Sequence, residues 1–541
     1  MIKKNAALAA STIAAMAALL LTTLAQAQTA PPPRVPLAPQ VLSNGPIHAK
    51  DAARFGYLGL VRTRSAAEIR AAGLSHPFGI GGETTDRDYS SFDLWKSYLG
   101  PTGALKVRVQ SGWHDIEKVI TQPASYDFAK LDKIVDGALA RGVEPYVFLG
   151  YGNERPGCLN CGTRNLAGAL PTGTGKQKFL DYVRATVTRY SQPTARVTDW
   201  EIWNEPDGHV PVDQYAQLIV EVAQLIKSIQ PQAKLTIGSF TAGVMGGSTT
   251  SSSIYAKTAV DYFAANRGPG VPAADVAVAY HPYYASVDHD NFPSELAKYQ
   301  WFKDMVEVHG FRIRQNENGA PSGPCLYYAL CGLAWTEEDQ AKYLLRRLLG
   351  DFSRGVESSI FTLVDLHYDA TKNVKGLLET GTWDGNVDTP YLNGDQTVKR
   401  QKVAYRAYQH VTAIFDNRLK LVPDAGCSKP YGYTVQAYTR NEPGGVVRNL
   451  IAVWRKVDAL PRPTTEASID ITCSKFHFPR FAGNPTLRPR LVDMVDGRVY
   501  ALNTSDTVAL NDAVGNKLQI KALPVADYPV LLSDQGIVLF D

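Results

Sequence analysis

The stretch that decides the fold is Val197-Thr198-Asp199-Trp200-Glu201-Ile202-Trp203-Asn204-Glu205-Pro206-Asp207. Its first seven residues are rich in β-branched and aromatic side chains, which predicts a strand that ends before the proline. A second stretch, Arg312-Ile313-Arg314-Gln315-Asn316-Glu317-Asn318-Gly319, has the same form. In both stretches a glutamate, Glu205 or Glu317, stands at the carboxyl end of the predicted strand. Parallel α/β barrels carry their functional residues at this end of their strands.

The region from 77 to 417 alternates short apolar runs with amphipathic stretches, which predicts strands that alternate with helices. Eight strands are expected, at 78–81, 106–110, 145–151, 197–203, 234–239, 276–280, 312–316 and 360–365. Helical spacing is clear in segments such as 128–141, 215–229, 295–309 and 337–354. Eight strand–helix units predict a (β/α)8 TIM barrel. An open doubly wound sheet is the alternative, but no G-x-G-x-x-G motif opens the first helix.

The pattern changes after about residue 418 to short β-type runs separated by Gly, Pro, Asn and Asp. These runs lie at 433–438, 449–454, 467–471, 490–494, 517–523 and 528–532. They predict an antiparallel β-sandwich. The fold class is therefore α/β, a TIM barrel followed by a small C-terminal antiparallel β-sandwich domain. We place the barrel at 48–417, with a lead-in at 48–76, and the β-sandwich domain at 418–541.

The N-terminus has the form of a secretory signal peptide over residues 1–27. Lys3 and Lys4 precede an apolar stretch, and Ala25-Gln26-Ala27 is a small-x-small cleavage site. An N-terminal membrane anchor is the alternative, but the apolar stretch of about 15 residues is shorter than the roughly 20 that span a bilayer. A Pro-rich tether follows at 28–47. We therefore expect a periplasmic or secreted protein with no membrane association after the signal is removed.

The composition is that of a globular protein and gives no sign of a polyanionic partner. The chain has 541 residues, 45% hydrophobic and 20% charged, so it has the apolar content that disordered chains lack. Its formal net charge is +4, which leaves no electrostatic footprint for nucleic acid or an anionic membrane. The oligomeric state is not indicated by the sequence.

Six cysteines fit an exported chain, because oxidising compartments allow disulfides to persist. Their clustering suggests three local pairs among the 15 possible pairings: Cys158–Cys161, Cys325–Cys331 and Cys427–Cys473. A redox role for the C-x-x-C spacing is the alternative for the first pair. That segment is a polar loop without the helix N-terminus that would lower a thiol pKa.

Glu205 and Glu317 end strands 4 and 7 of the predicted barrel, which lie across the barrel axis from one another. Two carboxylates are therefore expected to face each other over the mouth. This pair is what glycosidic bond cleavage needs, because one carboxyl group protonates the leaving oxygen and the other attacks or activates water. Two glutamates at strand ends also arise by chance, so the neighbouring residues matter.

Those neighbours suit a sugar site. Asn204 can bind a sugar hydroxyl, and His281 and Tyr283, after strand 6, can orient the carboxylates. Strand 2 ends in Arg108, Gln110, Trp113 and His114, which offer a cation and an aromatic platform.

Other polar groups at strand ends have alternative readings. Glu83 can bind a sugar hydroxyl or make a structural hydrogen bond, and so can Asp365. Glu201 is expected to be buried and paired with a barrel cation. Asp288-His289-Asp290 is expected to be a solvated loop. The histidines show no metal-ligand spacing, so no metal or other cofactor is expected.

The motifs resemble those of clan A glycoside hydrolases, retaining enzymes with glutamates on strands 4 and 7. Trp203-Asn204-Glu205-Pro206 resembles the acid/base signature of that clan. More specific similarity to family 39 and its β-xylosidase-like relatives lies in four runs: Arg108-Val109-Gln110-Ser111-Gly112-Trp113, Tyr126-Asp127-Phe128, Tyr151-Gly152-Asn153 and Arg314-Gln315-Asn316-Glu317-Asn318-Gly319-Ala320-Pro321-Ser322. The resemblance covers residues 77–417, and a trailing β-domain is also typical.

The resemblance implies a role for each matching residue. Glu205 would be the general acid/base and Glu317 the nucleophile. Asn204 would bind the 2-hydroxyl of the sugar, Tyr283 would hydrogen-bond Glu317, and His281 would sit near Glu205. Arg108 would hold Glu317 ionised.

The sequence departs from the clan pattern after strand 8. Many members carry a tryptophan there as the floor of the sugar site, whereas this chain has Phe361-Thr362-Leu363-Val364-Asp365. Trp383 or Trp335 takes that place, or the pocket recognises something unusual. Trp113 and Trp383 would supply stacking faces.

The favoured hypothesis is an exported retaining glycoside hydrolase that acts on an oligosaccharide or polysaccharide. Long loops around the mouth predict a pocket and exo-action, and the resemblance favours a β-linked neutral sugar such as xylose. Endo-action is one alternative. A non-catalytic polysaccharide-binding or export-assembly protein on the same barrel is another.

Overall fold

The computed structural model describes ten segments of the chain. They are residues 55–82, 87–121, 123–164, 170–289, 293–368, 371–382, 394–456, 459–478, 489–502 and 518–541. The predicted signal peptide (1–27) and Pro-rich tether (28–47) lie outside them, as do Glu83 and Trp383.

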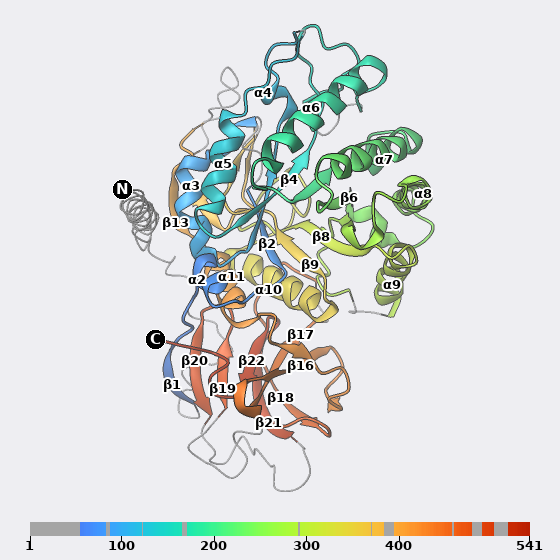
Figure 1. Ribbon diagram of the computed structural model, residues 1–541. Coiled ribbons are helices and arrows are strands. Elements are labelled where there is room, and N and C mark those ends of the chain that lie inside the picture. Colours follow the sequence, from blue (N-terminus) through green and yellow to red (C-terminus); the bar gives the residue numbers. More distant parts are fainter. Residues whose placement is uncertain are drawn as a thin grey trace, which may run out of the picture. The chain divides into compact units, whose positions relative to one another are not determined.

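Eight parallel strands form a closed barrel, which confirms the predicted fold class (Figure 1). The strands are β2 (Phe78–Gly81), β3 (Lys106–Gln110), β4 (Glu144–Leu149), β5 (Asp199–Ile202), β6 (Lys234–Phe240), β7 (Val276–Tyr280), β8 (Arg312–Asn318) and β9 (Glu357–Ile360). Each strand pairs with the next along the chain, and β9 pairs with β2 to close the ring. Because all eight strands run the same way, their carboxyl ends meet at one mouth.

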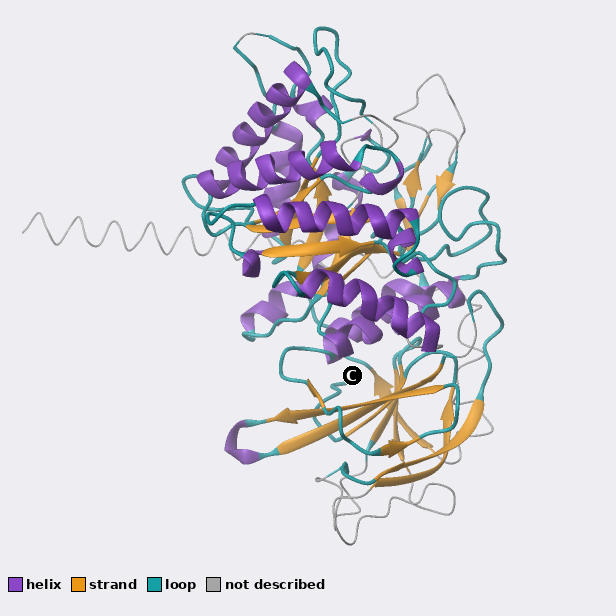
Figure 2. Cartoon of the chain, turned by 90° about the vertical axis from the view of Figure 1, so that its right-hand side faces the viewer, coloured by secondary structure: helices purple, strands orange, loops and turns teal. Residues whose placement is uncertain are grey.

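Helices follow the strands on the outside of the barrel (Figures 1 and 2). The helices are α2 (Ala66–Ala71), α3 (Phe92–Leu99), α4 (Trp113–Ile116), α5 (Ala129–Leu139), α6 (Gly173–Ser191), α7 (Val212–Ile229), α8 (Ser251–Asn266), α9 (Pro293–Glu307), α10 (Glu337–Arg354) and α11 (Val403–Ile414). In α5 the buried residues are Leu131, Ile134, Val135 and Ala138, which is the spacing of one helix face.

The last barrel strand lies earlier than the sequence pattern predicted. It spans Glu357–Ile360, not 360–365. The apolar residues after it turn to β12 (Leu378–Thr380), because the backbone oxygen of Leu363 accepts from Leu378 at 2.9 Å and the N–H of Asp365 donates to Leu378 at 3.0 Å. The N–H of Leu363 still reaches Gly81 at the end of β2. A covering loop buries these apolar residues. They are therefore as hydrophobic as strand residues, although they do not belong to the barrel strand.

Antiparallel sheets form the C-terminal part of the chain. The seven-stranded sheet has the order β1-β20-β19-β22-β17-β16-β14, and a three-stranded sheet has the order β15-β18-β21. Their bounds are β1 (Phe55–Leu60), β14 (Lys420–Leu421), β15 (Cys427–Ser428), β16 (Tyr433–Asn441), β17 (Val447–Arg455), β18 (Ala467–Cys473), β19 (Arg490–Asp493), β20 (Arg498–Leu502), β21 (Leu518–Val525) and β22 (Val530–Ser533). Strand β1, from the predicted lead-in to the barrel, pairs with β20.

Short two-stranded ribbons complete the described structure. They pair β10 (Leu366–His367) with β11 (Lys372–Asn373) and β12 (Leu378–Thr380) with β13 (Val398–Gln401). Both lie in the segment between β9 and α11, on the loop that follows the last barrel strand.

Helix α10 carries buried cations that contact the C-terminal part of the chain. Lys342 Nζ lies 3.3 Å from Asp527, between β21 and β22, and Arg346 donates to the backbone oxygen of Lys456 at 3.1 Å. Arg346 also donates to Asp288, in the segment after β7, at 2.9 Å. Asp288 also accepts from Trp454 at 2.9 Å and is buried, so the expectation of a solvated loop at this residue was wrong. Within the described segments, no helix combines the length and the apolar character needed to cross a bilayer.

Candidate active site

The backbone at the end of β5 is strained and aims Glu205 at the mouth. Trp203 and Glu205 have φ angles of 64° and 45°, in the left-handed region that non-glycine residues rarely adopt. The N–H of Glu205 donates to the backbone oxygen of Ser239 at 3.0 Å, which ties the turn to β6. Strain of this kind persists only where the surroundings hold it, and it clusters at functional sites.

Glu317 lies at an irregularity in β8. The register of β8 against β9 shifts between Gln315 and Asn318, so an extra residue enters the ladder there. Such bulges re-aim side chains and are common beside active sites. The shift presents Glu317 to the mouth opposite Glu205.

The two carboxylates lie close together, as the sequence predicted from their strand positions. One carboxylate oxygen of each glutamate and one ring nitrogen of His281 all lie within 4.8 Å of one another. Nδ1 of His281 lies 2.8 Å from Oε1 of Glu205, and the Tyr283 hydroxyl donates to Oε1 of Glu317 at 2.8 Å. Both bonds match what the family resemblance implied for these residues. Two carboxylate oxygens no more than 4.8 Å apart fit the roughly 5–5.5 Å between the carboxyl groups of retaining glycosidases, and inverting enzymes have roughly 6.5–9.5 Å.

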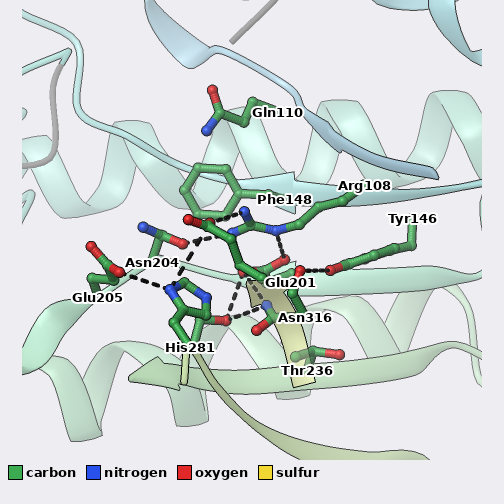
Figure 3. A network of polar contacts seen from close by, with 12 residues as sticks. Arg108, Gln110, Tyr146, Phe148, Glu201, Asn204, Glu205, Thr236, His281 and Asn316 are labelled. Carbon is green, nitrogen blue, oxygen red and sulfur yellow. Dashed lines mark hydrogen bonds and ion pairs between the residues drawn. The ribbon is translucent and has the colours of Figure 1, made fainter. Parts of the chain in front are cut away.

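Arg108 joins this pair to the barrel interior (Figure 3). Its guanidinium, wholly buried on β3, donates to Glu317 Oε2 at 2.7 Å and to Asn204 Oδ1 at 2.6 Å. Two further bonds, of 2.6 and 2.7 Å, reach the two oxygens of Glu201. A planar guanidinium with fixed donors suits this bidentate contact and leaves Arg108 little freedom to move. Arg108 therefore positions Glu317, although the sequence also suggested it as a substrate contact.

The contacts of Glu317 favour its ionised form. Burial by itself would raise the pKa of Glu317, but His281, Arg108 and the Tyr283 hydroxyl together hold that pKa below its ordinary value. Burial would likewise lower the pKa of His281, but Glu317 and Glu205 outweigh it and raise that pKa. A nucleophilic carboxylate must be ionised, and Glu317 is in surroundings that keep it so.

Glu205 has a more open environment. Its side chain is 22% exposed, against 13% for Glu317, and its Oε1 is bonded to a titratable imidazole and not to a permanent cation. A group that exchanges a proton with substrate and water needs such access. The two carboxylates thus differ in exposure and in the charge of their partners.

Glu201 is buried and paired with a barrel cation, as expected from its place inside the strand. Besides Arg108, it accepts from the Ser239 hydroxyl at 2.6 Å and from Asn316 Nδ2 at 2.9 Å. Its carboxylate balances the charge of Arg108 beneath Glu205 and Glu317. It makes no contact with the mouth and is 0% exposed.

Asn204 has one side-chain atom left for a substrate. Its Oδ1 is held by Arg108, which fixes the orientation of the amide. Its Nδ2 has no hydrogen-bond partner within the described residues, beside Glu205 at the mouth. This arrangement leaves Nδ2 available to donate to a ligand at the mouth.

Two tryptophans proposed from the sequence as sugar-binding faces are core residues. Trp113 is 0% exposed, packs against Phe179 and Tyr182, and donates its Nε1 to Glu117 at 2.7 Å. Trp335 is also buried and donates to the backbone oxygen of Leu330 at 2.6 Å. Neither ring can stack on a sugar, so these predictions were wrong. A tryptophan in the segment after a barrel strand gives no sequence signal that separates a sugar platform from a small local core.

The remaining predicted residues lie apart from the pair or outside the described segments. His114 is partly buried, and its contact is with Asp115 at 3.4 Å, not with Glu205 or Glu317. Glu83 and Trp383 lie outside the described residues. The three disulfides, Cys158–Cys161, Cys325–Cys331 and Cys427–Cys473, are present in the structure.

Glu205, His281 and Glu317 also have the donor types of a metal site. Two of these groups are already committed to each other, and the oxygens of Glu317 are bonded to Arg108 and Tyr283. Arg108 places a full positive charge against Glu317, which disfavours a second cation there. The contacts of these three groups therefore favour a carboxylate–imidazole cluster over a metal site.

Sequence reasoning missed the residues that support the site from below. Ser239 on β6 has φ of 45°, and its hydroxyl donates to Glu201. Asn316 on β8 donates its Nδ2 to Glu201 and to the Ser239 hydroxyl. Asn316 directly precedes Glu317, but alternation along a strand turns it to the interior, which was the available signal.

Comparison with solved structures gives the fold an independent reference. No protein-family model matches the chain, and no curated protein sequence matches it. A family 39 glycoside hydrolase from the gut symbiont Bacteroides cellulosilyticus WH2 is 17% identical, with a TM-score of 0.54, over 85% of this chain and 81% of that chain. A monomeric β-xylosidase from Caulobacter crescentus CB15 is 15% identical, with a TM-score of 0.51, over 88% of this chain and 97% of that chain. The GH39 enzyme from Xanthomonas axonopodis pv. citri is 15% identical, with a TM-score of 0.52, over 85% and 94%. The chain therefore has the fold of these family 39 enzymes, as its motifs implied.

Proposed function

We propose that this protein is a retaining glycoside hydrolase in which Glu317 is the nucleophile and Glu205 the general acid/base. The observation that carries the proposal is the close pair of carboxylates with unlike surroundings. Glu317 is held ionised by Arg108, His281 and Tyr283, whereas Glu205 is more open and shares a hydrogen bond with His281. The similarity in fold to family 39 enzymes is consistent with this assignment.

The reaction proceeds in two displacements. In the first, a carboxylate oxygen of Glu317 bonds to the anomeric carbon while the bond from that carbon to the leaving oxygen breaks. Glu205 gives its proton to the leaving oxygen. In the second, Glu205 takes a proton from water, the water oxygen bonds to the anomeric carbon, and the ester bond to Glu317 breaks. The products are a free sugar and an alcohol, and both glutamates return to their starting states.

The neighbouring groups orient these steps. Arg108 and Tyr283 each donate a hydrogen bond to one oxygen of Glu317. The same bonds stabilise the carboxylate that re-forms when the ester breaks. Asn204 offers Nδ2 to a hydroxyl of the reacting sugar. We further propose that the protein is exported, because three disulfides suit an oxidising compartment. Chain-end action on a β-linked sugar remains the proposal for its mode of attack.

Variants of the two glutamates test the proposal on a panel of aryl glycosides. Glu317→Ala should abolish turnover on every substrate, because no covalent intermediate can form. Glu205→Ala should retain activity on substrates with good leaving groups and should regain rate with azide, which replaces the activated water. Proton NMR of the first-formed product should show the anomer of the substrate.

Two outcomes would contradict this assignment. If both variants kept activity within a few-fold of the wild type, the pair would be misassigned. If the wild type bound oligosaccharides without cleaving any of them, a polysaccharide-binding protein would be the better description.

A further inference from the structure

Lys375 lies at the mouth of the barrel on a backbone that is tightly fixed. Its backbone oxygen accepts from Gln340 Nε2 at 3.0 Å, and its N–H donates to Asn373 Oδ1 at 3.1 Å. The next two residues bond to the segment that follows β9. Gly376 donates to Asp365 Oδ1 at 3.0 Å, and Leu377 donates to the backbone oxygen of Thr362 at 3.0 Å.

The contact at Gly376 leaves no room for a side chain. A Cβ at this position would lie 2.0 Å from the backbone nitrogen of Asp365, so the loop is pressed against the end of the barrel wall. Strand β9 in that wall neighbours β8, which carries Glu317. Lys375 is thereby held on the same side of the mouth as the proposed nucleophile.

The side chain of Lys375 is buried without an ion pair. It is 2% exposed, and no acidic side chain of the described segments lies within ion-pair distance of its Nζ. Four lysines are buried among the described residues, and the other three each have a carboxylate within 4 Å. These pairs are Lys227 with Asp275, Lys342 with Asp527, and Lys402 with Asp365.

An ammonium group in this state is costly to the fold. Burial lowers the pKa of Lys375 to about 8, and the negative charge of Glu317 partly opposes that effect. The amine is thus within the electrostatic reach of Glu317, but the oxygens of Glu317 are already bonded to Arg108 and Tyr283. A buried charge that the protein leaves uncompensated beside reactive groups points to a function and not to stability.

We propose that Lys375 is a specificity residue that binds an anionic substituent, a carboxylate or a sulfate ester, on the sugar ring attacked by Glu317. The proposal rests on the glycosidase function above and names its substrate class. An anionic group supplies the counter-charge that the other buried lysines obtain from protein carboxylates. A sugar hydroxyl would accept one hydrogen bond and leave the charge unbalanced. The near-balanced net charge averages over the whole surface and does not describe the surroundings of Lys375.

Matched pairs of aryl glycosides test the proposal. The pairs are β-glucuronide with β-glucoside, β-galacturonide with β-galactoside, and a 6-sulfated glucoside with its unsulfated form. We expect one charged member to have the highest kcat/KM of the panel, and which one it is distinguishes a carboxylate from a sulfate. In Lys375→Met the ratio of charged to neutral kcat/KM should fall about 100-fold, as expected for loss of a buried charged hydrogen bond. Lys375→Arg should restore part of that ratio.

Lys372→Met is the matched control. Lys372 lies on the same loop, and its ammonium donates to the backbone oxygen of Thr380 at 2.7 Å and lies 3.7 Å from a carboxylate oxygen of Asp365. Its variant should keep the wild-type ratio, so a general disturbance of the loop is separated from a loss of the charge at 375. A neutral member preferred by the wild type, or an unchanged ratio in Lys375→Met, would overturn the proposal.

A binding measurement separates this proposal from the glycosidase function. The melting temperatures of the wild type and of Lys375→Met are measured with glucuronate, galacturonate or glucose 6-sulfate, and with glucose or galactose for comparison. If no aryl glycoside is cleaved, the glycosidase proposal fails, but a charged sugar should still stabilise the wild type more than Lys375→Met. Equal effects of charged and neutral sugars, equal responses of the two proteins, or no stabilisation by any charged sugar would overturn the role of Lys375.

Discussion

Tyr283→Phe removes one hydrogen bond from the proposed nucleophile and little else. The hydroxyl donates to Glu317 Oε1 at 2.8 Å, and the ring that remains keeps its packing. The bond favours ionised Glu317, whose pKa lies below its ordinary value. Without the bond, the pKa of Glu317 should rise. Since the first displacement needs the ionised form, the acidic limb of the profile of kcat/KM against pH should move to higher pH.

The size of the effect follows from the type of bond. A hydrogen bond to a charged group contributes about 1.5–3 kcal/mol, and a tenfold change corresponds to about 1.4 kcal/mol. The acidic limb should therefore move by about one to two pH units. The second displacement releases the Glu317 carboxylate, so its rate should fall roughly 10- to 150-fold. On substrates with good leaving groups, kcat and KM should then fall together, because the covalent intermediate accumulates.

Steady-state rates of an aryl glycoside across pH 3–9 are the assay. Tyr284→Phe is the matched control, because the hydroxyl of Tyr284 donates to the backbone oxygen of Ala242 and not to either glutamate. That variant should keep the acidic limb of the wild type. An unmoved limb in Tyr283→Phe, together with kcat within threefold of the wild type, would refute the role of Tyr283 and weaken the assignment of Glu317.

Three further predictions concern the support of the site and its mode of attack. Glu201→Gln leaves Arg108 buried without its main counter-charge, so denaturant unfolding should show a loss of about 3–5 kcal/mol. In this variant the acidic limb of the profile of kcat/KM against pH should move to lower pH, because Arg108 then lowers the pKa of Glu317 more strongly. The shift is opposite to that expected for Tyr283→Phe. Replacing Cys325 and Cys331 by Ser should lower the free energy of unfolding by roughly 2 kcal/mol, and replacing Cys427 and Cys473 should lower it by roughly 4 kcal/mol, because loop-closure entropy grows with loop length. Of these two pairs, only Cys325–Cys331 should also affect kcat/KM, since its loop follows Glu317. Product analysis on a long oligosaccharide should show one or two sugars released at early times, whereas a ladder of mid-sized fragments would mean endo-cleavage.

The sequence predicted the site best where strand position alone decides the geometry. Glu205 and Glu317 are far apart in the chain, but both end a parallel strand, and a closed barrel brings all such ends to one mouth. The contacts of His281 and Tyr283 followed from the family resemblance of the same strand ends. These features depend on topology, which hydrophobic periodicity encodes locally.

Features whose burial depends on distant segments were predicted less well. Trp113 is a core residue in the helix after β3, and the last barrel strand begins three residues earlier than its apolar run suggested. In both places burial comes from segments distant in sequence, so a hydrophobic pattern indicates that a residue is covered without indicating by what. The pairing of β1 with β20 is a similar case, because the two strands stand at opposite ends of the chain.

The sequence by itself determined the barrel, the β-rich C-terminal part and the two glutamates at the mouth, because each follows from local periodicity and from strand order. The tertiary structure alone decided how those groups are charged and what surrounds them. Arg108 could have faced any carboxylate of the interior, and the fold places it between Glu201 and Glu317. Lys375 has the sequence signature of an ordinary loop lysine, and only packing shows it buried without a counter-charge near the nucleophile. Electrostatic interactions depend on the distances between charged groups from separate strands and loops, and a local sequence pattern does not contain those distances.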